Sequence, residues 1–261
     1  MDSAPLKILM FGWEFPPFNS GGLGVACQGL AGGLASLGAQ ITFVLPKKLA
    51  GDYRGICEFV FADEQKEYRQ LAETIAIDSP LSPYLSRASY STALGGYEKI
   101  ADSGIWRKDL VGEVMRYAEL AAGIAKNRDF DVIHCHDWLS LPAGLAAKKA
   151  SGKPLVFHVH ATEYDRVGEN GLNRDICLVE REGLRQADAV IAVSDYTKNL
   201  IIDRYGVNPD KIISVPNAVN HDEFLAGNAA EFENLKKSGK KIALFVGRLT
   251  FQKGKNFCIH P

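Results

Sequence analysis

The chain has 261 residues, of which 46% are hydrophobic and 23% charged, so it is long enough to bury a large core. Its 30 basic and 31 acidic residues leave a formal net charge of −1, which argues against a general affinity for nucleic acid or anionic membranes. No apolar segment approaches the length that crosses a bilayer, and the start, MDSAPLK, is atypical of a signal peptide.

Five cysteines are scattered along the chain without the CxxC spacing of metal or redox motifs. An odd number at irregular spacing favours reduced thiols and therefore predicts a cytoplasmic protein. The simplest interpretation makes all five structural residues of the core. They are Cys27, Cys57, Cys135, Cys177 and Cys258.

Seven short apolar runs, rich in Val, Ile and Phe, alternate with helical patterns. Such runs are typical of strands buried on both faces of a parallel sheet. The segments between them would form right-handed helical crossovers, so the predicted fold class is α/β, with a Rossmann-like, doubly wound parallel sheet. The predicted strands are residues 7–12, 40–46, 57–62, 131–136, 154–160, 188–194 and 211–216.

One segment fits this alternation badly. Residues 63–105 contain Pro80, Pro83 and a Ser-rich stretch, and they show little periodicity. We expect an excursion there, either a lid over a site or, as the simpler interpretation, a surface insertion. The helices are predicted at 22–38, 109–127, 139–150, 173–186 and 195–205, the last with cap signals at Ser194 and Gly206.

The C-terminal part of the chain indicates a change of domain. A strand ends at VPN, a polar connector follows, and KKIALFVGRLTFQKG at 240–254 is typical of the strand and cationic loop that open an α/β domain. We therefore expect an N-terminal domain at 1–216, a linker at 217–239 and the truncated start of a second domain at 240–261. The chain is expected to fold but to lack activity by itself.

A glycine-rich turn, GGLG at 21–24, joins the first predicted strand to the first helix. Glycines let the backbone approach a ligand, and a helix N-terminus favours a phosphate. A dinucleotide fingerprint fails because its third glycine is missing after Gly24, and the chain lacks the Gly-Lys-Ser/Thr of a P-loop. A tight turn without a ligand is the alternative interpretation.

Polar residues gather where the predicted strands end. Because open parallel sheets bind ligands outside the carboxyl ends of their strands, these residues should share one rim with the glycine turn. They are Trp13 and Glu14 after the first strand, residues 136–138 after the fourth, residues 160–163 after the fifth and Ser194 after the sixth.

Six motifs follow one another between residues 7 and 254: GWEFPPFNSGGLG, HCHDWLSLPAG, VFHVHATEYDR, AVIAVSDYTK, VPNAVN and FVGRLTFQKG. In this order the chain resembles the N-terminal half of a retaining glycosyltransferase of the GT-B fold, in the glycogen and starch synthase group (glycosyltransferase families 4 and 5). The resemblance implies transfer of a hexosyl group, glucose above all, from ADP-glucose or UDP-glucose to an α-glucan or small sugar.

The resemblance also assigns residues to the donor. Gly22, Leu23 and Gly24 would offer backbone N–H groups to the donor diphosphate. Arg248 and Lys253 would neutralise the charge on the departing nucleotide. Residues 19–20 are Asn-Ser where glycogen synthases commonly carry Lys-Thr, which counts against a strict glycogen synthase and its usual donor.

Four further assignments concern the sugars. His160 would hold a sugar hydroxyl while oxocarbenium character builds at C1. Asp137 would accept a hydrogen bond from the acceptor, with Trp138 packed beneath it, and Glu14 would also point to the acceptor. The alternatives are a buried strand-end histidine satisfied by backbone for His160, and a helix N-cap for Asp137.

Two His-x-His pairs, at 134–136 and 158–160, suggest a metal. Residues i and i+2 of a strand share a sheet face that helices should cover, and no spacing completes a zinc set, so we expect no metal and no cofactor. The expected partners are the nucleotide-sugar donor, the sugar acceptor and the C-terminal domain, but neither nucleic acid nor membrane. Competing functions are a non-catalytic sugar- or glucan-binding module and a dinucleotide enzyme such as an epimerase, the latter disfavoured by the failed fingerprint.

Overall fold

The computed structural model describes residues 4–17, 21–48, 57–64, 110–219 and 237. Within this part of the chain, all seven predicted strands form one parallel sheet in the order β3-β2-β1-β4-β5-β6-β7. The predicted α/β class with a Rossmann-like sheet is therefore confirmed. The strands are β1 (Lys7–Phe11), β2 (Gln40–Leu45), β3 (Glu58–Phe61), β4 (Val132–His136), β5 (Leu155–Val159), β6 (Ala189–Ala192) and β7 (Ile212–Ser214).

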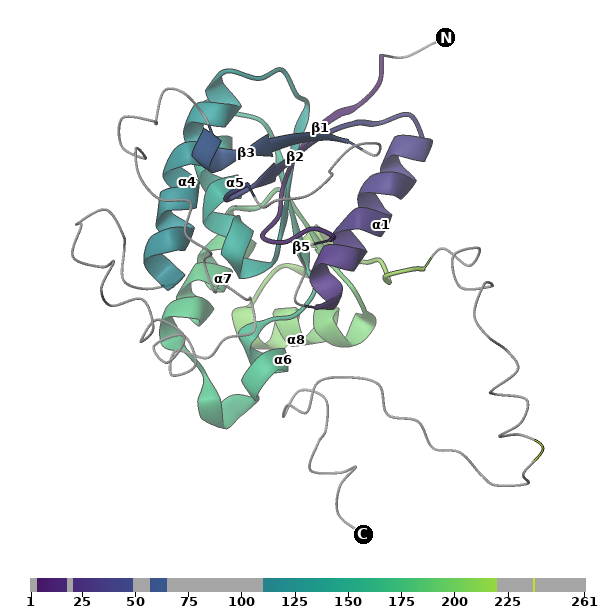
Figure 1. Cartoon of the computed structure of the whole chain (residues 1–261). Coiled ribbons are helices and arrows are strands. Elements are labelled where there is room, and N and C mark those ends of the chain that lie inside the picture. The colour runs from purple at the N-terminus through teal and green to yellow at the C-terminus, as the bar shows by residue number, and fades with distance from the viewer. Residues whose placement is uncertain (1–3, 18–20, 49–56, 65–109, 220–236, 238–261) are drawn as a thin grey trace.

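Helices cover both faces of the sheet, and in Figure 1 α4 and α5 lie on one side of the strands while α1 lies on the other. Alternate strand residues face the two layers. Leu9 and Phe11 belong to the core beneath α4, α5 and α7, whereas Ile8 and Met10 belong to the core beneath α1. The helices are α1 (Gly22–Ser36), α4 (Leu110–Lys126), α5 (Asp137–Ser151), α6 (Glu163–Val167), α7 (Arg174–Gln186) and α8 (Asp195–Tyr205), with 3₁₀ turns at Ala62–Glu64, Glu169–Gly171 and Pro209–Lys211.

The strand order reverses direction between β1 and β4. From β1 the chain moves outward through β2 to β3, and after β4 it moves the other way through β5 and β6 to β7. The loops that follow β1 and β4 therefore diverge at their carboxyl ends, where open α/β sheets bind their ligands. The glycine turn follows β1, and Asp137 follows β4 directly.

Tyr117 of α4 anchors the loop after β1. Its buried hydroxyl lies 2.7 Å from the carbonyl oxygen of Val44 and 3.1 Å from that of Gly12. Gly12 is required by packing, because a Cβ there would meet the Phe43 ring at 2.5 Å. The residues after β1 thus leave the sheet in one fixed direction.

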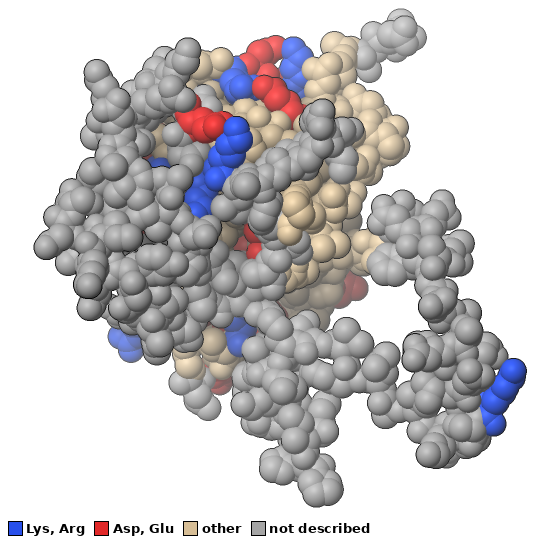
Figure 2. All heavy atoms as spheres, in the orientation of Figure 1, with Lys and Arg blue, Asp and Glu red and all other residues tan. Residues whose placement is uncertain are grey.

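The described surface carries charges of both signs. Figure 2 shows Lys and Arg side chains close to Asp and Glu side chains on this face, and the ion pairs include Lys7–Asp129 and Arg128–Glu58. Among the described residues, no helix is both long enough and apolar enough to cross a membrane. Most of the predicted excursion at 63–105, and nearly all of the predicted linker and second domain, lie outside the described residues.

Candidate functional site

The glycine turn begins helix α1. Gly21 is its N-cap residue and makes no side-chain cap. Glu14, buried in the loop after β1, accepts a hydrogen bond from the Gly24 amide through Oε1 at 3.0 Å. One of the three amides assigned to a donor phosphate is therefore already bonded to a carboxylate. This link was not predicted, because the motif gives the order of the residues and not the path of the loop.

Gly22 lies in the first turn of α1, where neither packing nor backbone strain requires glycine. Among the described residues, no atom lies within 4 Å of a Cβ built on Gly22, and Gly22 is not one of those with a positive φ angle. The tight-turn interpretation therefore lacks a physical reason at this position. Open space above the first turn of a helix is what an approaching anion needs.

Four imidazoles from β4 and β5 lie together on the α1 side of the sheet. His136 pairs in register with His158, and each strand adds a second histidine two residues away. Nε2 of His134 lies 3.3 Å from Nδ1 of His158, and Nδ1 of His136 lies 3.1 Å from Nε2 of His160. At Nε2, the partner of the partly exposed His160 is thus an imidazole and not a backbone group.

Burial keeps these four histidines uncharged. It disfavours the imidazolium form and lowers the pKa of His134 and His158 to about 3 and that of His160 to about 4. Burial, with its histidine neighbours second, also holds the pKa of His136 well below the usual range. Nε2 of His136 and Nε2 of His158 are buried without a hydrogen-bond partner among the described residues.

Asp137 joins the ends of β4 and β5. Its Oδ1 accepts hydrogen bonds from the backbone N–H of His160 at 2.7 Å and of Ala161 at 3.2 Å. The N-cap of α5 is His136, without a side-chain cap, so the helix-cap interpretation of Asp137 is wrong. Burial raises the pKa of Asp137 to about 6, against the opposing effects of Arg166 and the two amides. The carboxylate therefore positions the backbone that carries His160.

Arg166 holds the other side of the same loop. Its guanidinium donates to the carbonyl oxygen of Ala161 at 3.0 Å and to Oε1 of Glu180 at 2.7 Å. Glu180 also accepts from the Glu163 amide at 3.1 Å and from the Tyr205 hydroxyl. Asp137 and Arg166 thus bind the N–H groups and a carbonyl of one short segment, and they fix its direction.

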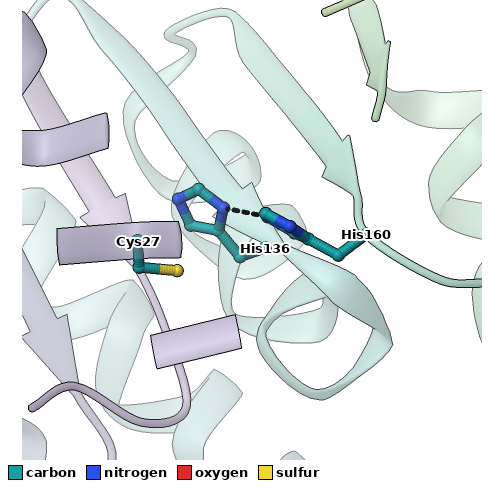
Figure 3. Close-up of side chains that lie close together, drawn as sticks. All are labelled: Cys27, His136 and His160. Atoms are coloured by element: carbon teal, nitrogen blue, oxygen red, sulfur yellow. Dashed lines mark hydrogen bonds between the residues drawn. The ribbon is translucent and has the colours of Figure 1, made fainter. Parts of the chain in front are cut away.

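Cys27 belongs to helix α1, which covers the face of the sheet that carries the four histidines. In Figure 3 it projects from α1 beside His136 and His160, and one ligand atom from each of the three residues lies within 4.8 Å of the other two. Cys27 was predicted to be a core residue, and it is buried as expected. No local motif connects it with histidines more than a hundred positions away.

Of the other predicted site residues, Trp138 is described by the structure and two cations are not. Trp138 is only 3% exposed and packs in the core cluster beneath α5, so any contact with an acceptor stays a prediction. Arg248 and Lys253 lie outside the described residues. The rim itself is present, because Glu14 contacts the glycine turn and Asp137 contacts the residues after β5.

The chain is similar in sequence to known glycosyltransferases. A profile of glycosyltransferase family 4 matches residues 20–223. An uncharacterized glycosyltransferase of Methanocaldococcus jannaschii is 29% identical over 264 residues, covering 97% of this chain and 58% of that protein. The glycogen synthase of Mycobacterium tuberculosis strain H37Rv is 24% identical over 263 residues, covering 95% and 56%. The chain thus spans little more than half the length of the curated relatives it matches.

Solved structures share the fold. Sucrose-phosphate synthase of Thermosynechococcus elongatus superposes with a TM-score of 0.59 at 16% identity, over 88% of this chain and 52% of that one. The Anabaena protein HepE, solved with UDP and glucose, gives a TM-score of 0.53 at 15% identity, over 90% and 50%. Since the family profile covers most of the chain and the sheet agrees with these neighbours, the chain belongs to glycosyltransferase family 4, with the GT-B type of fold.

Proposed function

We propose that the chain is the acceptor-side half of a retaining hexosyltransferase that moves glucose from ADP-glucose or UDP-glucose to an α-glucan or small sugar. Membership of glycosyltransferase family 4 supports the transfer reaction. The relative named glycogen synthase, and the neighbour solved with UDP and glucose, support the choice of sugars. The observation that carries the proposal is the uncharged His160, held by Asp137 at the carboxyl rim of the sheet.

The donor diphosphate would lie at the N-terminus of α1. This helix has 15 residues, and a Cβ at Gly22 in its first turn would meet no atom of the described residues within 4 Å. The partial positive charge of the helix end and the N–H groups of its first turn favour a phosphate there. Arg248 and Lys253 are proposed to bind the diphosphate from the other lobe. Glu14 would then hold the Gly24 amide in place while the preceding residues contact the phosphate.

His160 would contact the transferred sugar. Cleavage of the bond to the nucleotide leaves positive charge on C1 and the ring oxygen of that sugar. A charged imidazolium would repel this charge, whereas the low pKa of His160 keeps the ring neutral at pH 7. A neutral imidazole next to the sugar can hold a hydroxyl by a hydrogen bond without this repulsion.

Asp137 would contact the acceptor. An ionised carboxylate offers about four lone-pair sites, and the two backbone amides use part of this capacity through Oδ1. An acceptor hydroxyl that donates to the same side chain would lie next to His160 and therefore next to C1. We propose that the reaction needs no metal or other cofactor, because fixed cations take the charge of the leaving diphosphate.

The test is nucleotide release by the full-length protein that contains this chain. ADP-glucose and UDP-glucose are offered with glycogen or maltooligosaccharides, and proton NMR of the product reports whether the anomeric configuration is retained. Loss of the His160 contact in His160→Ala should lower turnover at least about a hundredfold in a protein that still melts cooperatively. His160→Gln, which keeps a polar end, is the control and should retain more activity. Glucan binding without nucleotide release would instead identify a sugar-binding module, and near-normal turnover in folded His160→Ala would remove the role of His160.

A further inference from the structure

We propose that Cys27, His136 and His160 form a binding site for a thiophilic divalent cation of the Zn²⁺ class, and that such an ion inhibits the protein by competing with the sugar donor. The binding site stands on the geometry alone. The competition rests on the proposed function, because it assumes that His160 contacts the donor sugar.

The three side chains already lie close to a metal-binding arrangement. One ligand atom from each residue lies within 4.8 Å of the other two, and Nδ1 of His136 is 3.1 Å from Nε2 of His160. Two nitrogens bound to tetrahedral zinc at about 2.05 Å are about 3.3 Å from each other. The two nitrogens would therefore stay almost as far apart as they are, and each ring would turn by about 35° to aim its lone pair at a tetrahedral ion that replaces the shared hydrogen.

The protons balance in a simple way. Both imidazoles are neutral before and after binding: the hydrogen that they share moves to the far nitrogen of the ring that donated it, so each ring then carries one N–H on the nitrogen that faces away from the ion. The thiol of Cys27 becomes a thiolate, so one proton per ion leaves for the solvent. Burial first, then the carboxylates of Asp137 and Glu14, raise the pKa of this thiol. The same two carboxylates would stabilise a bound dication.

A second group of histidines is a poorer candidate. His134, His136 and His158 also bring their nitrogens together, but all three are buried and supply no anionic ligand. A dication among them would be a buried charge without compensation. The site with Cys27 would supply a thiolate, and its third residue, His160, is partly exposed.

The first experiment uses Co²⁺ as a spectroscopic probe. The reduced, metal-free chain is titrated anaerobically, without any sugar. We expect one Co²⁺ per chain, a thiolate-to-cobalt charge-transfer band, the release of one proton, and displacement of the cobalt by Zn²⁺. Cys27→Ser should abolish the band and weaken Zn²⁺ binding at least about a hundredfold, because it removes one of three protein ligands.

Two other cysteines provide matched controls. Cys57 and Cys177 are partly buried thiols outside the three-residue group, so Cys57→Ser and Cys177→Ser should keep the full cobalt spectrum. His160→Gln, at the partly exposed end of the site, should weaken binding at least about tenfold without unfolding the chain. A charge-transfer band that persists in Cys27→Ser, or no cobalt binding by the folded chain, would overturn the proposal.

The second experiment tests competition in the full-length protein. Zn²⁺ should raise the apparent KM for the nucleotide-sugar at constant kcat, and Cys27→Ser should relieve this effect. Equal inhibition of both proteins would refute the competition. If the protein transfers no sugar at all, the cobalt titration still decides whether the metal site exists, so failure of the proposed function and failure of the site are distinguishable.

Discussion

Replacement of Asp137 tests the link between the ends of β4 and β5. Asp137→Ala removes the acceptor of two partly buried N–H groups and places alanine at a φ of 56°. Each unsatisfied donor costs about 1–3 kcal/mol, and left-handed backbone costs about 1–2 kcal/mol for a residue other than glycine, asparagine or aspartate. Asp137→Asn keeps an acceptor oxygen and tolerates this φ. The two variants should therefore differ in free energy of unfolding by at least about 3 kcal/mol, with alanine the less stable.

The charge of Asp137 adds a pH dependence to this comparison. The pKa of Asp137 is about 6 in the folded chain, above the ordinary value near 4. The ionised carboxylate therefore destabilises the fold above pH 6. Protonation removes this penalty as the pH falls from 6 to 4. Asp137→Asn should thus be as stable as the unaltered chain, or up to about 2 kcal/mol more stable, at pH 7, and should lose this advantage by pH 4. Urea unfolding followed by circular dichroism at both pH values measures these differences. Equal stability of the alanine and asparagine variants would refute the role of Asp137.

Three further predictions concern the same rim. Gly22→Ala and its control Gly33→Ala both place a methyl group where no described atom lies within 4 Å. Gly33→Ala, in the helix interior, should stabilise α1 by about 0.5–1 kcal/mol, and Gly22→Ala, at the first helical residue, by less. Only Gly22→Ala should raise the KM for the nucleotide-sugar of the full-length protein, and equal KM values would contradict the phosphate site. Asp137→Asn should impair transfer to the acceptor more than hydrolysis of the donor, and equal loss of both would point to a purely structural role. The thermal midpoint should fall as the pH decreases from 6.5 towards 4, because the unfolded chain binds protons that the four buried histidines do not bind in the folded chain. This effect should outweigh the opposite effect of Asp137, Glu163 and Glu180, whose pKa values are raised by burial. A midpoint that is constant from pH 7 to pH 5 would exclude this.

Much of the fold was predictable because its elements have local causes. Continuous Val, Ile and Phe runs marked all seven strands, and Ser194 and Gly206 marked the ends of α8 as cap residues. Helix α6 was not predicted. It has five residues and begins with a capping box between Thr162 and Asp165, which is too short to show a hydrophobic period.

The candidate site was predictable only as a rim. Parallel strands place their carboxyl ends together, so the positions of Asp137 and His160 followed from the strand pattern. Which imidazole meets which depends on the register of β4 and β5, and that register is set by packing across the whole sheet. The approach of Cys27 depends on how α1 crosses the sheet. Cover of this sheet face by helices was the reason for expecting no metal, yet the covering helix α1 supplies the third side chain, Cys27.

The contacts of Arg166 determine how the His160 loop can be exchanged between proteins. Its partner Glu180 lies in α7 and binds Tyr205 of α8, while the loop is bonded on its other side to Asp137. Residues 137–205 therefore behave as one block in recombination. A crossover between Arg166 and Glu180 would place each buried charge beside residues from the other parent protein. Where that parent lacks the matching charge, the free energy of unfolding should fall by about 3–5 kcal/mol. A graft bounded by residues 137 and 205 would carry the loop together with Asp137, Arg166 and Glu180.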